Sequence, residues 1–173
     1  MDRKSAGALG ASVRCRWRVP RGAQGATLTE ESGRVARIER TFNAPIGDVF
    51  DAWTSPEVMR RWFHCLPDWE TPVVEVELRV GGKIRVVMRR PDGTEIEAQG
   101  LFTVIDRPHR LVMTWTFDDD PSNEQLLELS LSESAGATTV LLLNSRISTD
   151  ERRDEQAKGW HGCLDELARV LAS

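Results

Sequence analysis

The chain has 173 residues, with 23 Lys and Arg against 27 Asp and Glu, which gives a formal net charge of −4. This length suits one domain, which buries about two-thirds of the surface that its unfolded chain exposes. The charge is unevenly divided, because residues 1–34 carry seven basic and three acidic side chains, whereas residues 35–173 carry 16 basic and 24 acidic ones. The acidic body lacks the clustered basic face that phosphate binding requires, so we expect no nucleic-acid partner.

Targeting signals are weak along the chain. No stretch approaches 18 apolar residues, which predicts that no transmembrane helix is present. The apolar run at residues 6–11 is short, broken by glycine and soon followed by arginines, unlike a secretory signal. Three cysteines without a Cys-x-x-Cys pair favour a reducing compartment, so we expect a cytoplasmic protein.

Residues 1–34 are rich in Gly, Ala, Ser and Arg and show no hydrophobic periodicity. Such a composition predicts a disordered basic extension. Two functional alternatives are an arm that meets an acidic partner and an organellar transit peptide. The folded domain is therefore expected at residues 35–173.

One strand and two short helices are predicted at the start of this domain. Residues 35–42 alternate as a strand does. Pro45 is predicted at the first position of a helix, where its missing N–H is harmless, and Ile46, Val49, Phe50 and Trp53 share one face. A second helix is predicted after Ser55, its N-cap, with Pro56 at the first position and Trp62 on its apolar face.

An antiparallel meander is predicted next. Alternation in residues 73–80 places Val74, Val76, Leu78 and Val80 on one face, and Gly81-Gly82 indicates a two-residue hairpin. Further strands are predicted at residues 83–90, 94–105, 110–117, 126–131 and 138–144, with Gly100 as a candidate bulge. Residues 118–123 are expected to form a polar loop.

A long amphipathic helix is predicted at the end of the chain. The segment Ser148–Glu151 matches a capping box with Ser148 as the cap. A single apolar stripe follows it, formed by Ala157, Trp160, Leu164, Leu167 and Leu171. The element order predicts an α+β fold in which a curved antiparallel sheet of six or seven strands grips this helix. The cleft between sheet and helix is the default small-molecule site.

Several motifs occur in this order and resemble those of one family. They are residues 42–57, residues 61–63, the hairpin at residues 77–83, residues 110–116, and Gly159-Trp160 with Leu164. Over residues 35–172 the chain resembles homologues of the C-terminal domain of the activator of heat-shock-protein-90 ATPase. This resemblance implies the START-like (SRPBCC) helix-grip fold, whose members commonly hold hydrophobic ligands between the sheet and the C-terminal helix. The chain departs from the family after the second helix, where His64 and Cys65 replace a small turn, so ligand identity does not carry over.

The expected function is non-catalytic binding of a small hydrophobic or amphipathic molecule in this cavity. Aromatic and methionine side chains on the inward faces suit such a lining. The expected lining residues are Trp62, His64, Val86, Met88, Met113, Trp115, Trp160 and Leu164.

Two alternative functions stay open. One is a co-chaperone-like interaction module with a heat-shock chaperone as its partner. The other is an enzyme of the cyclase or dehydratase type with His64 as acid or base. A homodimer also stays open.

Other reactive residues carry weaker hypotheses. His64 and Cys65 suggest an activated thiolate, but adjacent side chains rarely face one another. His161 and Cys163 lie about 200° apart around a helix, which disfavours one metal ion, so no metal and no cofactor are expected. A Cys65–Cys163 disulfide is disfavoured by the reducing compartment. The pairs Glu75/Glu77 and Glu95/Glu97 are expected to face solvent.

Overall fold

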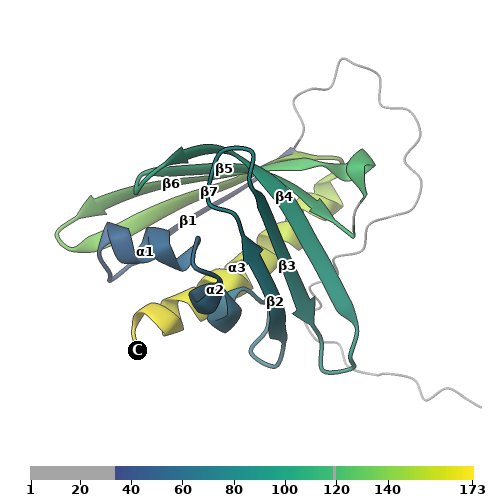
Figure 1. Ribbon diagram of the computed structural model, residues 1–173, viewed down its shortest axis with the longest axis horizontal. Coiled ribbons are helices and arrows are strands. Elements are labelled where there is room, and N and C mark those ends of the chain that lie inside the picture. The colour runs from purple at the N-terminus through teal and green to yellow at the C-terminus, as the bar shows by residue number, and fades with distance from the viewer. Residues whose placement is uncertain (1–33, 119) are drawn as a thin grey trace, which may run out of the picture.

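The computed structural model describes residues 34–118 and 120–173, so all but Arg34 of the expected disordered extension lies outside the described residues. Within these ranges the chain forms seven strands and three α-helices in the predicted order (Figure 1). The elements are β1 (Arg34–Phe42), α1 (Ile46–Ala52), α2 (Pro56–Trp62), β2 (Glu70–Val76), β3 (Lys83–Arg89), β4 (Glu95–Asp106), β5 (Arg110–Phe117), a short 3-10 helix η1 (Pro121–Asn123), β6 (Gln125–Ser134), β7 (Ala137–Ile147) and α3 (Asp150–Leu171).

All seven strands belong to one antiparallel sheet in the order β1-β7-β6-β5-β4-β3-β2. Figure 1 shows the sheet curving around α3, with α1 and α2 on the same concave side. The predicted α+β helix-grip fold is therefore confirmed. None of the helices in the described ranges combines the length and the apolarity that a bilayer crossing needs.

The core lies between the concave face of the sheet and α3. Alternation along β3 and β5 places every second side chain on this face, as predicted. Helix α3 contributes one buried stripe, in which Trp160, Leu164 and Leu167 are buried as predicted. Gln156 also lies on this buried face, a position that the apolar pattern does not predict.

The prediction for the β2–β3 connection is wrong. Strand β2 ends at Val76, and the side chains of Leu78 and Val80 are 41% and 64% exposed. The six residues between the strands form a turn that is closed by backbone hydrogen bonds within it. Arg79 N donates to Glu77 O, and Gly82 N donates to Arg79 O. Gly81 N donates to Phe102 O, which ties the turn to β4 instead of prolonging the hairpin.

Two helix starts are shifted by one residue from their predicted positions. Pro45 is the N-cap of α1, and the helix begins at Ile46. Helix α3 is capped by Thr149, whose hydroxyl accepts a hydrogen bond from Arg152 N at 3.2 Å, and not by Ser148. The next residue performs the same capping chemistry, since Ser and Thr both accept from the first turn.

Two glycines allow close backbone approach. A Cβ on Gly100 would lie 1.7 Å from Thr114 O, while the register shift of β4 lies further along, between Phe102 and Val104. A Cβ on Gly162 of α3 would lie 2.2 Å from Cys65 O. Gly162 therefore lets the loop after α2 lie directly against α3.

We predict opposite effects for alanine at two helical glycines. Gly162→Ala should lower the free energy of unfolding by about 1–3 kcal/mol, because the new methyl group overlaps the Cys65 backbone. Gly47→Ala in α1 is the matched control, since nothing lies within 4 Å of its Cβ position, and it should raise stability by up to about 1 kcal/mol. Urea unfolding measures both values. Shifts of the same sign would contradict the close packing of the loop on α3.

Candidate functional site

The eight residues predicted to line the cavity come from every part of the concave side. Trp62 ends α2 and His64 follows it, while the others lie on β3, β5 and α3. All eight side chains are buried in the interior. Their role as a ligand lining stays a prediction, because burial alone also fits a packed core.

Aromatic rings form the centre of this interior. The ring of Trp160 lies 6.2 Å from Trp115, 6.0 Å from Trp53 and 5.7 Å from Phe63, measured between centroids. Trp62 lies 4.7 Å from Trp53 in an edge-on arrangement, and its indole N–H donates to Ala52 O at 2.9 Å. Trp160 of α3 is therefore in contact with the sheet and with the segments around α1 and α2.

A chain of buried polar side chains lies beside these rings. Trp160 Nε1 donates to Asn144 Oδ1 at 3.1 Å, and Asn144 Nδ2 donates to Gln125 Oε1 at 3.0 Å. Gln125 and Asn144 are both 0% exposed. Gln125 pairs with Trp115 across β5 and β6, so the chain lies directly against the aromatic cluster.

Several polar atoms of this interior have no hydrogen-bond partner among the described residues. They are two indole N–H groups, one amide nitrogen and one amide oxygen, namely Trp53 Nε1, Trp115 Nε1, Gln125 Nε2 and Gln156 Oε1. Leaving such a group unpaired in a protein interior costs about 1–3 kcal/mol. The interior can therefore form hydrogen bonds with a molecule placed next to these atoms, whether water or a ligand.

None of these buried amide side chains was predicted to lie in the site, although the periodic pattern of the sequence contains a signal for each. Gln125 lies one residue before the predicted strand and continues its inward alternation with Leu127. Asn144 ends the predicted strand at residues 138–144 on its buried face. Gln156 lies one helical turn before Trp160. Extending the strand and helix patterns by one step would have included Gln125 and Gln156, while Asn144 already belonged to its predicted strand.

His64 is held at the edge of the interior by two neighbouring elements. Its Nδ1 lies 3.4 Å from Thr71 Oγ1, and the Thr71 hydroxyl donates to Phe63 O at 2.8 Å. Since the Thr71 hydroxyl proton is directed to Phe63, the Thr71 oxygen can accept a hydrogen bond from His64 Nδ1 when that nitrogen carries the ring proton. The other ring nitrogen, Nε2, lies 3.9 Å from a carboxylate oxygen of Glu166 on α3.

The environment of His64 favours the neutral imidazole. Burial lowers the pKa of His64 from its ordinary value, and the Glu166 carboxylate opposes this shift with a smaller effect. Glu166 also pairs with Arg169 one turn further along α3, which draws part of its charge away from the ring. At neutral pH His64 is therefore a buried, neutral side chain with a protein group facing each ring nitrogen.

The cysteines and carboxylates carry no assembled catalytic or metal site. Cys65 and Cys163 are both buried, and no disulfide joins them. Within residues 34–118 and 120–173, no group of three or more His, Cys, Asp or Glu side chains is arranged to hold a metal ion. Three of the four carboxylates predicted to face solvent are exposed, while Glu97 is half-buried. Arg85 pairs with both Glu75 and Glu97 on the outer face of the sheet.

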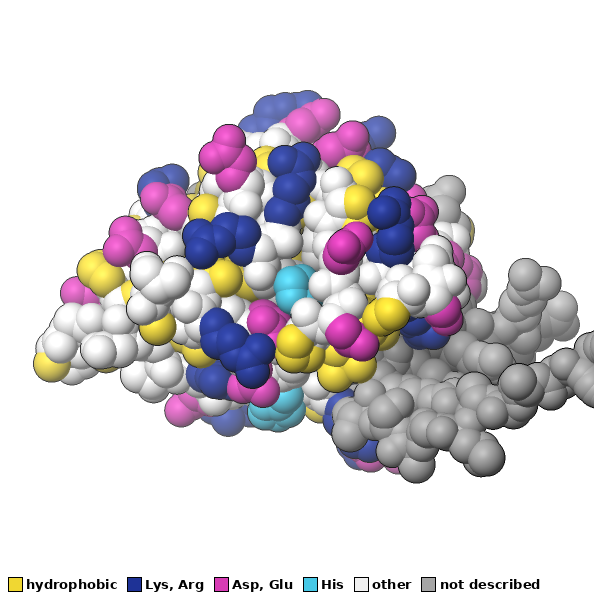
Figure 2. Space-filling model, turned by 90° about the horizontal axis from the view of Figure 1, so that it is seen from below, with side chains coloured by type: hydrophobic (Ala, Val, Ile, Leu, Met, Phe, Trp, Pro, Cys, Tyr) yellow, Lys and Arg dark blue, Asp and Glu magenta, His cyan; other side chains and the backbone are white. Residues whose placement is uncertain are grey.

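An open groove of about 750 Å³ lies on this outer face, between β2 and η1. Two of its hydroxyl groups already have partners within the sheet, because Thr114 Oγ1 accepts from Leu101 N and Thr116 Oγ1 donates to Gln99 O. On the opposite side of the molecule, which is seen from below in Figure 2, basic and acidic side chains are interspersed. The interior beneath α3 is therefore a stronger candidate site than the outer groove.

We predict that acid destabilises the protein through His64. Its lowered pKa means that the unfolded chain binds a proton more readily, so stability falls as the pH drops below about 6.5, the ordinary value. His64→Gln should remove this part of the pH dependence, as measured by urea unfolding between pH 8 and pH 5, a window of roughly the histidine range.

His161→Gln is the matched control for this measurement, because His161 is exposed on α3. It should leave the pH dependence of the parent chain in place. An unchanged pH profile in the His64 variant would show that the burial of this ring does not control the acid response.

Comparison with known proteins identifies relatives of the whole domain. The family model described as Activator of Hsp90 ATPase homolog 1-like protein matches residues 43–172. No match was found among curated proteins.

Solved structures share the fold. A Chromobacterium violaceum protein is 20% identical, with a TM-score of 0.73, and the match covers 80% of this chain and 97% of that one. An AHSA1 protein from Silicibacter pomeroyi is 23% identical, with a TM-score of 0.72 over 80% of this chain and 98% of that one. CalU16 from Micromonospora echinospora is 27% identical, with a TM-score of 0.62 over 80% and 76% of the two chains.

Proposed function

Since the chain belongs to the family of Activator of Hsp90 ATPase homolog 1-like proteins, we propose that it binds a small hydrophobic or amphipathic molecule between the concave face of the sheet and α3. One observation carries this proposal, namely the unpartnered polar atoms of Trp115, Gln125 and Gln156 among buried aromatic rings. A mostly apolar pocket with a few convergent polar groups is the usual composition of a small-molecule site.

The polar atoms also limit how such a molecule would lie. Its apolar body would pack against the rings of Trp115 and Trp160, which come from opposite walls of the interior. Its hydrogen-bonding group would meet the donor atoms Trp115 Nε1 and Gln125 Nε2. Binding would then recover about 1–3 kcal/mol for each buried group that gains a partner.

The geometry supports binding more than catalysis. A cyclase or dehydratase reaction would use His64 as acid or base, but Thr71 and Glu166 face its two ring nitrogens. A general base must lie within hydrogen-bond reach of the proton that it removes. A chaperone-directed role has the family's description as its only support.

Binding can be tested with N-phenylnaphthylamine, an uncharged aromatic probe that fluoresces in apolar surroundings. We expect one probe molecule per chain, with energy transfer from the buried tryptophans, because Trp115 and Trp160 would contact it. A chain that binds no probe while folded would overturn the proposed function.

Gln156→Met tests the role of the unpartnered oxygen. The probe-free chain should gain about 1 kcal/mol of stability, because the variant removes a buried unpaired acceptor and keeps the side-chain length. Its affinity for the probe, whose amine donates a hydrogen bond, should fall about fivefold. Thermal unfolding and fluorescence titration measure the two effects.

Lys158→Met is the control, since Lys158 is exposed on the same helix and the substitution adds the same side chain. It should change neither stability nor affinity. A loss of stability in Gln156→Met would mean that the glutamine oxygen has a partner within the protein.

A further inference from the structure

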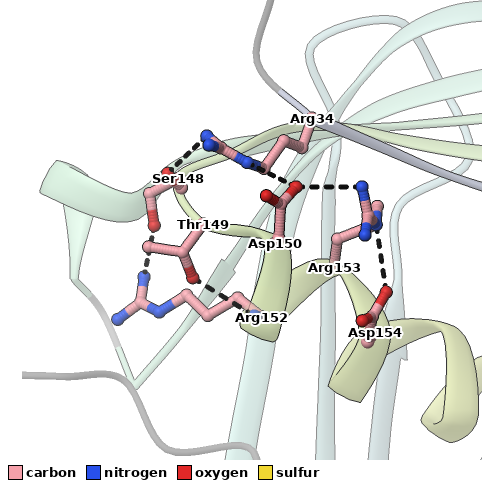
Figure 3. A network of polar contacts seen from close by, with 7 residues as sticks. All are labelled: Arg34, Ser148, Thr149, Asp150, Arg152, Arg153 and Asp154. Atoms are coloured by element: carbon pink, nitrogen blue, oxygen red, sulfur yellow. Dashed lines mark hydrogen bonds and ion pairs between the residues drawn. The ribbon is translucent and has the colours of Figure 1, made fainter.

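One arginine at the start of α3 differs from its neighbours. Arg34 donates to Asp150 at 2.7 Å, and Arg153 pairs with Asp150 at 2.9 Å and with Asp154 at 3.0 Å. Figure 3 shows Arg152 in the same network, where its guanidinium meets Ser148 and no carboxylate. Within the described residues, Arg152 forms no ion pair.

Neutral oxygens hold the Arg152 side chain in place. Its Nη1 donates to Asn123 Oδ1 at 2.7 Å and to Ser148 Oγ at 3.1 Å. Its Nε atom is buried and has no partner among the described residues. A buried guanidinium N–H without an acceptor is costly, and more so than a neutral one, because the group is charged.

The electrostatic surroundings compensate this cation only in part. Burial lowers the pKa of Arg152, and the charges of Asp120 and Glu155 oppose the shift with smaller effects. Arg152 also lies in the first turn of α3, where the helix dipole adds positive potential. An anion bound here would be attracted both by the charge of Arg152 and by the positive end of the helix dipole.

Arg152 lies at the end of the polar groups beneath α3. Gln156 follows it by one helical turn, about 6 Å along the axis. Asn123, the Arg152 acceptor, ends η1 two residues before Gln125, which pairs with Trp115 across β5 and β6. The unpartnered atoms Arg152 Nε, Gln125 Nε2 and Trp115 Nε1 are all donors, whereas Gln156 Oε1 is an unpartnered acceptor.

We infer that the ligand of this interior is an amphipathic organic anion, with its carboxylate or similar oxyanion at Arg152 and its apolar body against Trp115 and Trp160. This inference rests on the proposed function and names the chemical class of the ligand. An oxyanion accepts several hydrogen bonds at once, which suits a donor-rich site whose cation has no ion pair with any described residue. An uncharged ligand would add no negative charge beside Arg152.

Two probes that differ only in charge test the inference on the full-length chain. Anilinonaphthalene sulfonate carries an oxyanion, whereas N-phenylnaphthylamine has the same ring system without it. We expect the sulfonate to bind about tenfold more tightly, as a charged hydrogen bond implies. Arg152→Gln should abolish this preference and leave the affinity for the uncharged probe unchanged, which also shows that the variant is folded.

Arg153→Gln is the matched control. Arg153 is the next residue of the same helix, and Asp150 and Asp154 already neutralise it, so the sulfonate should keep its preference in this variant. Equal affinity of the two probes for the parent chain, or a preference retained in Arg152→Gln, would overturn the inference and leave the proposed function standing. Failure of both probes to bind would overturn both.

Discussion

The contact of Trp160 with the concave face of the sheet is the interaction on which the rest of the structure depends. Its indole ring meets aromatic side chains from the sheet and from the α1–α2 region, and its N–H donates to Asn144 on β7. Helix α3 is thereby fixed over the sheet by both apolar packing and a directional hydrogen bond. Gly162, half a turn further on, lets the loop that carries His64 and Cys65 close against the same helix.

Beneath α3, the interior contains buried polar groups that lack hydrogen-bond partners among the described residues. Each unpartnered polar group costs about 1–3 kcal/mol, a large share of a typical domain stability of about 5–15 kcal/mol. An apolar side chain of the same size at Gln156 would avoid this cost, whereas at Gln125 it would leave Asn144 Nδ2 without its acceptor. Retaining polar groups there is reasonable if they serve recognition, because binding sites commonly trade stability for function.

The fold was largely predictable from the sequence because its elements are strongly periodic. The alternation in β5 and the apolar stripe of α3 each identify one buried face, and both were confirmed. The errors fell where backbone geometry outweighs side-chain pattern. Leu78 and Val80 continue the alternation of β2, yet the turn hydrogen bonds at Glu77 and Arg79 remove them from the sheet.

The candidate site was predictable only in its apolar part. Trp115 and Trp160 were expected inside because large apolar side chains define the inward faces. Gln125 and Asn144 were not expected, because a polar residue at the end of a strand is equally typical of a solvent-exposed terminus. Among residues 34–118 and 120–173, Arg152 has no ion pair because Asp150 pairs with Arg34 and Arg153 instead, and spacing along the chain does not reveal which arginine a carboxylate pairs with.

A crystal structure of the chain with N-phenylnaphthylamine would test most directly whether the interior beneath α3 is a binding site. The account predicts density for one probe molecule between α3 and the sheet, in contact with Trp115 and Trp160 and with its amine within hydrogen-bond distance of Gln156 Oε1. An interior containing only closely packed side chains and isolated water molecules at its polar atoms, with the probe elsewhere or absent, would contradict it.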